Sequence, residues 1–200
     1  MSLFQNILII AILITGAGFL SLTEIALAGA RKVKLKILAE SGDDRAQKVL
    51  NLQEHSAEFF AASQIGLNAI AILGGILGEA AFRPYFVTLI DRVYVGPWTD
   101  TIGFTLSFTL VTSLFILFAD LMPKRLAMIA PEKIAISVIN PIQVFIKICK
   151  PLAWMINAIA NLLFRLFKVN TIRDDNITFA DISAVMDAGA QAGVLQKQEH

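Results

Sequence analysis

The chain has 200 residues, of which 56% are hydrophobic and only 16% are charged. This composition is too apolar for an ordinary soluble domain of this size and predicts an integral membrane protein. The formal net charge of +1 carries no information about partners. Cys149 is the only cysteine, which excludes an intrachain disulfide, and two histidines are too few to suggest a histidine-based metal or catalytic site.

The first apolar segment, Leu3–Leu27, is long enough for the roughly 20 residues that a helix needs to cross a bilayer. It lacks the basic start and the clear cleavage site of a signal peptide, so we interpret it as a retained span. The basic segment 31–38 follows and predicts a juxtamembrane amphipathic helix. Its apolar face is expected to consist of Val33, Ile37 and Leu38.

A second short helix is predicted to run to Gln53, with Asp43 as its N-cap. The next apolar segment, Glu58–Phe82, is again long enough to cross a bilayer. It contains Gly74 and Gly78, and this GxxxG spacing lets two helix backbones approach closely. We therefore expect tight helix packing at this point of the second span.

A third span is predicted over Ile102–Leu121, after a connecting loop at Arg83–Thr101. The segment Ile134–Val169 holds two apolar runs, which are interrupted by polar residues and by Pro141 and Pro151. Because neither run offers 20 uncharged residues, we favour a re-entrant or interfacial helical belt over two further spans. The predicted fold class is all-α integral membrane, with three transmembrane helices, juxtamembrane amphipathic helices and this belt.

Residues 1–170 are expected to form the transmembrane domain, because the composition becomes polar after Asn170. Residues 171–200 predict a cytosolic linker and a short helix capped by Thr178, leading into a missing part of a longer protein. Cytoplasmic loops carry an excess of lysine and arginine. The loop after the first span has six basic residues and the loop after the second has two, which predicts an outside N-terminus and a cytoplasmic C-terminus.

Two carboxylates, Glu24 and Asp120, lie among apolar residues of the predicted spans. An acid at membrane depth costs roughly 2.5 to 3.5 kcal/mol on insertion scales, so it normally faces the protein interior and marks an ion pathway. Four further polar side chains are expected near the same depth: Ser21, Gln64, Asn68 and Ser113. Converging oxygen atoms suit a hard cation such as Mg²⁺, or an ammonium group that needs acceptors. These six residues form the predicted cation-binding site.

The same residues also allow ordinary structural interpretations. Glu24 and Asp120 can be interface carboxylates that contact headgroup water, and Gln64 with Asn68 can hydrogen-bond between helices. Serine and threonine in such helices often bond to the carbonyl four residues back. The convergence of these groups at one depth, rather than any single residue, favours a site.

Three motifs carry a resemblance to a known family: FLSLTEIAL at 19–27, QIGLN at 64–68 and DLMPK at 120–124. They resemble motifs of the CNNM/CorC family of transmembrane domains, and the similarity extends over about residues 1–170. The resemblance implies three transmembrane helices, a membrane-hugging belt and a homodimer. It also implies a cytosolic pair of CBS domains, which would begin where this chain ends.

Members of that family are linked to Mg²⁺ export driven by Na⁺. The resemblance implies that Ser21, Glu24, Asn68 and Asp120 lie in or near the cation site. If Mg²⁺ is the substrate, its ligands would include Ser21, Asn68 and Asp120. The pair Ala119-Asp120 stands where the family pattern has Gly-Glu. A shorter acid should alter a tight octahedral Mg²⁺ cage.

Residues 63–76 and 117–125 resemble a bacterial inner-membrane branch of the family that is associated with export of the diamines putrescine and cadaverine. We therefore predict a transporter and not an enzyme: a homodimeric inner-membrane exporter of a small cation, with a diamine first and Na⁺-coupled Mg²⁺ or other divalent-metal efflux second. The third hypothesis is a non-transporting membrane anchor for a cytosolic sensor. The expected partners are the bilayer, a second copy and the substrate. Neither a cofactor nor nucleic acid is expected, and Mg²⁺ or Na⁺ would be a transported or coupling ion.

Overall fold

The computed structural model describes residues 3–167, and this part of the chain consists of helices and short connections without β-strands. The helices are α1 (Leu3–Gly29), α2 (Lys32–Glu40), α3 (Asp44–Glu54), α4 (Ser56–Ile90), α5 (Thr99–Leu114), the π-helix η1 (Phe115–Leu121), α6 (Met122–Ile129) and α7 (Pro131–Leu166). The predicted all-α class is confirmed. The predicted linker and the helix at Thr178 lie outside the described residues. The chain forms two compact units, and the arrangement below is that of the first, which ends at Ile156.

Four helices of the described chain are long and apolar enough to cross a membrane: Phe4–Gly29, Ser56–Ile90, Thr99–Ile129 and Pro131–Ile156. The first three contain the three predicted spans. The fourth is one more than predicted, because α7 continues as one helix through Pro141 and Pro151. A proline removes only its own backbone donor, and packing of the apolar face can offset that loss. A re-entrant hairpin needs a chain reversal, so that part of the prediction is wrong, while an interfacial position of α7 stays a prediction.

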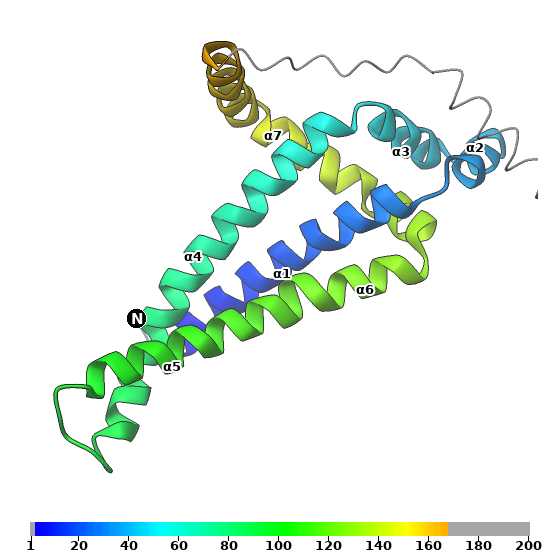
Figure 1. Cartoon of the computed structure of the whole chain (residues 1–200). Helices are drawn as coiled ribbons and strands as arrows, with labels where there is room; N and C mark the ends of the chain where they lie inside the picture. Colours follow the sequence, from blue (N-terminus) through cyan, green and yellow to red (C-terminus); the bar gives the residue numbers. More distant parts are fainter. Residues whose placement is uncertain (1–2, 168–200) are drawn as a thin grey trace, which may run out of the picture. The chain divides into compact units, whose positions relative to one another are not determined.

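The helix α1 lies between α4 on one side and the continuous α5–η1–α6 segment on the other (Figure 1). It is apolar around most of its circumference, as expected for a helix that contacts protein on some faces and lipid on the others. The α2–α3 hairpin and the loop between α4 and α5 lie at opposite ends of this arrangement. The core is densest at the hairpin end, where Leu35, Phe59 and Ile139 are all fully buried.

The helices α4 and α5 pack closely at glycines. A Cβ atom built on Gly78 would lie 2.5 Å from a methyl carbon of Val111, and one on Gly74 would overlap the ring of Phe115. The tight packing predicted from the GxxxG spacing is therefore confirmed, and the partner is the next helix of the same chain. Val87 fits against Gly103 of α5 in the same way, which extends this contact toward the connecting loop.

The second span is longer than predicted. The helix α4 continues through Pro84 to Ile90, so the predicted loop at Arg83–Thr101 is helical over its first part. The side chain of Arg83 connects this part of α4 to the next helix. It pairs with Asp100 of α5 and with Glu79 one turn earlier in α4. The actual connection between the two spans is short and begins after Ile90.

The second helix of the α2–α3 hairpin, α3, has the predicted residue Asp43 as its N-cap. The Asp43 carboxylate accepts a hydrogen bond from the backbone N–H of Arg45 at 3.0 Å, which is the N-cap contact. The side chain of Arg45 also bonds to this carboxylate, and these hydrogen bonds hold the pKa of Asp43 below its usual range. Gly42 precedes the cap with φ +98°, a left-handed conformation that glycine adopts without strain.

The apolar face predicted for the first juxtamembrane helix is exposed, and its place at the membrane boundary stays a prediction. Leu35 is the buried residue of α2, whereas Val33 and Ile37 are 72% and 60% exposed. Leu35 belongs to the same core cluster as residues of α3 and α7, so the side of α2 opposite Val33 and Ile37 is the one that packs on protein. The exposed Val33–Ile37 side remains available to an apolar environment such as the bilayer boundary.

Two sets of polar contacts fix the end of α1. The side-chain amide of Gln53 donates to the carbonyl oxygens of Leu27 at 2.8 Å and Ala30 at 2.9 Å. The last carbonyls of a helix have no partners within it, so this amide supplies donors that the helix lacks. Arg31, two residues after the end of α1, forms an ion pair with Glu132 of α7 at 3.2 Å. The α2–α3 hairpin and α7 thus hold the half of α1 that carries the predicted site.

Candidate cation-binding site

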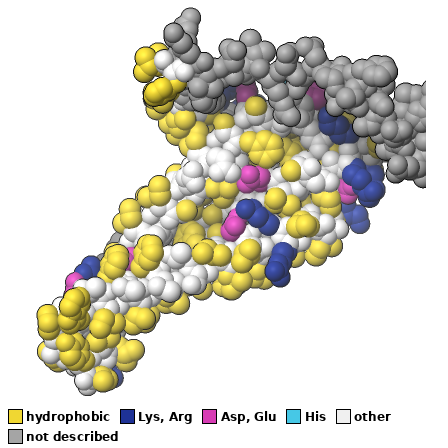
Figure 2. All heavy atoms as spheres, in the orientation of Figure 1, with side chains coloured by type: hydrophobic (Ala, Val, Ile, Leu, Met, Phe, Trp, Pro, Cys, Tyr) yellow, Lys and Arg dark blue, Asp and Glu magenta, His cyan; other side chains and the backbone are white. Residues whose placement is uncertain are grey.

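The two predicted carboxylates line one hollow of about 330 Å³ between α1, α4 and η1. Its polar lining consists of Ser21, Glu24, Gln64, Asn68, Asp120 and Lys124. Its apolar lining consists of Leu67, Ala71, Phe115, Ile116 and Ala119. Five of the six predicted site residues therefore come together, and the structure adds Lys124 to them. Figure 2 shows acidic and basic side chains next to one another in the middle of this face, with further charged side chains toward both ends of the molecule.

Asp120 is the most connected group of the hollow. The hydroxyl of Ser21, which is fully buried, donates to Asp120 Oδ1 at 3.2 Å. The ammonium of Lys124 forms an ion pair with the same oxygen from one helical turn further on. The side chain of Asp120 is 48% exposed, so a cation can still reach it.

Glu24 occupies the α1 side of the hollow with a neutral partner. The side-chain amide of Gln64 donates to Glu24 Oε1 at 3.2 Å. Asn68 follows Gln64 by four residues and therefore lies on the same face of α4. Its side chain makes no hydrogen bond within residues 3–167, so its amide oxygen can accept from, or coordinate, a bound cation.

The turn that carries Asp120 is a π-helix, which the sequence did not predict. The backbone N–H of Met122 bonds to the carbonyl of Leu117, five residues back, and Pro123 has no N–H at all. The carbonyls of Phe118 and Ala119 thus lose their usual helical donors. Single π-turns occur frequently at functional sites, because they widen the helix and expose backbone oxygen.

The helix α1 packs directly on this wide turn. A Cβ atom built on Gly18 would lie 3.3 Å from the carbonyl oxygen of Phe118 and 3.2 Å from Cγ of Pro123. Both distances are tighter than ordinary van der Waals contact. A glycine at this position therefore allows the backbone of α1 to come close enough for Ser21 to reach Asp120.

Ser113 is the predicted site residue that the structure does not bring to the hollow. It is exposed and does not belong to the lining. In a regular α-helix, residues seven apart lie within about 20° of one face. One extra residue in the intervening π-turn changes that relation by roughly 100°, since each α-helical residue turns the chain by that angle. Asp120 faces α1 as a result, and Ser113 does not.

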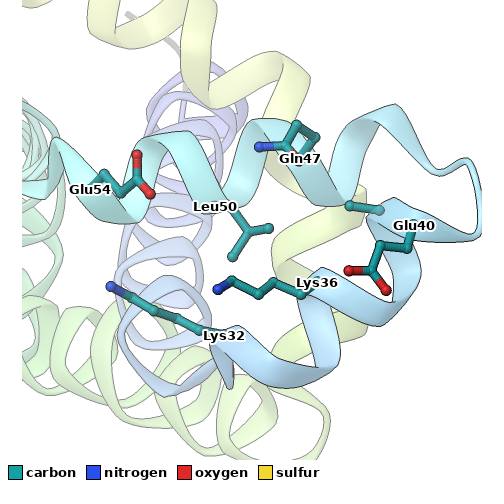
Figure 3. A pocket seen from close by; sticks show the side chains of 7 residues that line it. Lys32, Lys36, Glu40, Gln47, Leu50 and Glu54 are labelled. Atoms are coloured by element: carbon teal, nitrogen blue, oxygen red, sulfur yellow. The ribbon is translucent and has the colours of Figure 1, made fainter.

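A larger hollow of about 490 Å³ lies between α2 and α3, away from the intramembrane carboxylates. Lys32 and Lys36 extend from α2 toward α3, and Glu40 and Glu54 lie on the same groove (Figure 3). Two positive and two negative groups give this groove no net preference for a cation. The candidate cation-binding site is therefore the smaller hollow, in which two carboxylates face one lysine.

Fold and site together define an α-helical membrane protein with a carboxylate-lined hollow among three of its helices. A family model of the Cyclin M transmembrane N-terminal domain matches residues 8–199, and the chain belongs to this family. The family resemblance predicted from the three motifs is thereby confirmed.

The chain is similar to bacterial proteins named polyamine export protein. The one from Escherichia coli is 52% identical over 198 residues, which cover 99% of this chain and 44% of that protein. The one from Haemophilus influenzae is 48% identical over 200 residues, or 100% of this chain and 46% of that protein. The chain therefore spans less than half the length of these curated relatives. Its apolar helices and these relatives identify it as a bacterial membrane protein.

Proposed function

We propose that the chain is the membrane domain of an inner-membrane exporter of diamines such as putrescine and cadaverine. The observation that carries this proposal is the placement of Glu24 and Asp120, on different helices, in the lining of one hollow. A diamine has one ammonium group at each end of an apolar chain. Two carboxylates can each accept from one ammonium, while Leu67 and Ile116 offer apolar surface for the methylene groups. The names of the relatives described above support the same substrate class.

Efflux of Mg²⁺ or another divalent metal is the second candidate. It is supported by the Ser21–Asp120 contact of 3.2 Å and by the nearby amide of Asn68, which gather three kinds of oxygen ligand. Mg²⁺ demands near-octahedral geometry with oxygens at about 2.0 to 2.1 Å, so these groups would have to move closer together. A diamine accepts hydrogen-bond distances and a less regular arrangement, which is why we rank it first. In either case the activity is transport and not covalent chemistry.

Transport by the full-length protein in inverted membrane vesicles tests this proposal. Such vesicles expose the cytoplasmic face, so an exporter accumulates its substrate inside them. We expect labelled putrescine to accumulate above the level of vesicles that lack the protein. Accumulation of Mg²⁺ alone would replace the first candidate by the second. Accumulation of neither, with folded protein present, would favour a membrane anchor for cytosolic sensing.

We further propose an outside N-terminus and a cytoplasmic α2–α3 hairpin, supported by the excess of basic residues in the loop after the first span. Single cysteines in a Cys149→Ser background test it. A membrane-impermeant maleimide added to spheroplasts is expected to label Val95→Cys, in the exposed α4–α5 connection, but not Ser41→Cys, in the α2–α3 turn. Permeabilised cells should show both labelled, and the reverse pattern in spheroplasts would invert the orientation.

A homodimer is the working unit that the family resemblance supports. Large apolar side chains on the outer faces of the single chain, such as Ile72, Ile76 and Phe108, are exposed and suit contact with lipid or with a second copy. Na⁺ or Mg²⁺ would enter as a coupling or transported ion and not as a resident cofactor.

A further inference from the structure

Lys124 places a protein ammonium group where the proposed function requires a substrate ammonium group. It lines the hollow together with both carboxylates, and its Nζ atom forms an ion pair with Asp120 Oδ1. The Ser21 hydroxyl donates to the same oxygen. A carboxylate oxygen accepts about two hydrogen bonds through its lone pairs, so this atom is already satisfied.

We propose that Lys124 is a resident counter-ion that competes with the transported cation for Asp120. An incoming ammonium group must displace Lys124 from the carboxylate, and Lys124 returns when the substrate leaves. This inference rests on the proposed function, because it assumes that the hollow is the transport site. It adds a residue that controls binding and release at that site.

The two carboxylates differ in the way that this inference requires. Glu24 has the neutral amide of Gln64 as its partner, whereas Asp120 has a charged one. The hollow with Lys124 in place therefore carries one uncompensated negative charge, and a bound diamine that displaces Lys124 leaves none. An unpaired carboxylate is costly at membrane depth. Lys124 thus keeps Asp120 paired when no substrate is bound.

The ammonium group of Lys124 is also able to move away from Asp120. Its side chain is 36% exposed, and it stands on a flexible four-carbon stem that can carry the ammonium group to nearby water. The next residue, Arg125, is exposed and always charged, so this part of α6 is suited to a polar environment. The movement needs rotations within one side chain and no change in the packing of the helices.

Binding and transport by the full-length protein in nanodiscs and inverted vesicles test this inference. Lys124→Met is expected to tighten the Kd for putrescine about twofold to fivefold, the effect of removing one partly exposed competing charge. It should also slow turnover by a similar factor, because bound substrate is no longer displaced. Lys124→Arg keeps the charge and should stay near the wild-type Kd. Arg125→Met removes a neighbouring charge outside the hollow and should change neither quantity.

The outcomes separate the two proposals. Wild-type protein that binds no putrescine would refute the proposed function itself. Wild-type binding with an unchanged or weaker Kd in Lys124→Met would overturn the counter-ion role and leave the proposed function standing. Equal tightening in Lys124→Arg and Lys124→Met would also overturn it, because the charge would then be irrelevant. If Lys124→Met does not fold, as judged by size-exclusion chromatography, Lys124→Gln removes the same charge with a polar side chain.

Discussion

Asp120→Asn and Glu24→Gln are each expected to reduce putrescine transport by the full-length protein about fivefold or more. Loss of a partly exposed charged partner costs about 1 kcal/mol, which corresponds to that factor. Both acids line the same hollow, so either change leaves one ammonium group of a diamine without its charged acceptor. The measurement is the initial rate of labelled putrescine uptake into inverted vesicles at matched protein levels.

These two variants preserve the shape of the site. The asparagine oxygen can still accept from Ser21, and the glutamine oxygen can still accept from Gln64. Asp44→Asn is the control, because it removes one exposed carboxylate from α3 at a distance in sequence from the hollow and should leave transport unchanged. Full transport by both Asp120→Asn and Glu24→Gln would contradict the proposed role of these two acids in export. Absence of transport by the wild-type protein would favour the membrane anchor for a cytosolic sensor.

Gly78→Ala is expected to destabilise the protein by about 1 to 3 kcal/mol, the usual cost of overfilling a packed core. The added methyl would lie 2.5 Å from a side-chain carbon of Val111, which is buried and 1% exposed. Valine has one strongly preferred rotamer in a helix, so it cannot turn away at low cost. We expect a lower melting temperature of the purified protein in detergent, measured by the loss of helical circular dichroism.

The chain offers a matched control for this variant. Gly75 lies on the same helix, and a methyl group added there would have no neighbouring atom within 4 Å, so Gly75→Ala should be neutral or slightly stabilising. Combining Gly78→Ala with Val111→Ala should recover part of the loss, since the two positions are in direct contact. Equal destabilisation by Gly75→Ala and Gly78→Ala would show that helix contact is not the cause.

Much of the membrane fold could be predicted because bilayer thickness imposes a simple rule on apolar length. That rule located the three spans, and the two acids within them marked the hollow. The expectation that a proline ends a helix failed at Pro84 and Pro141, where the helices continue. Whether a proline ends a helix depends on tertiary contacts, and those contacts are not visible in a local window of sequence.

The candidate site was predicted in composition but not in geometry. Depth along each helix identified Glu24, Asn68 and Asp120, because Glu24 and Asp120 lie near the end of the first and third spans and Asn68 lies near the start of the second, at the same membrane boundary. Ser113 was included on the assumption of a regular helix, which the π-turn removes. Lys124 stands next to Pro123, a position that in sequence indicates only the end of a span and an interface anchor. Its pairing with Asp120 needs the three-dimensional course of that turn.

The wide turn at Phe115–Leu121 also marks the point at which the continuous α5–η1–α6 segment changes the helix that it packs against. Before the turn, α5 packs against α4, and from the turn onward η1 and α6 pack against α1. The hollow lies where the helix changes its neighbour. A rotation of α6 with α1, against a stationary α4–α5 pair, would therefore reshape the candidate cation-binding hollow while leaving the glycine contacts between α4 and α5 intact.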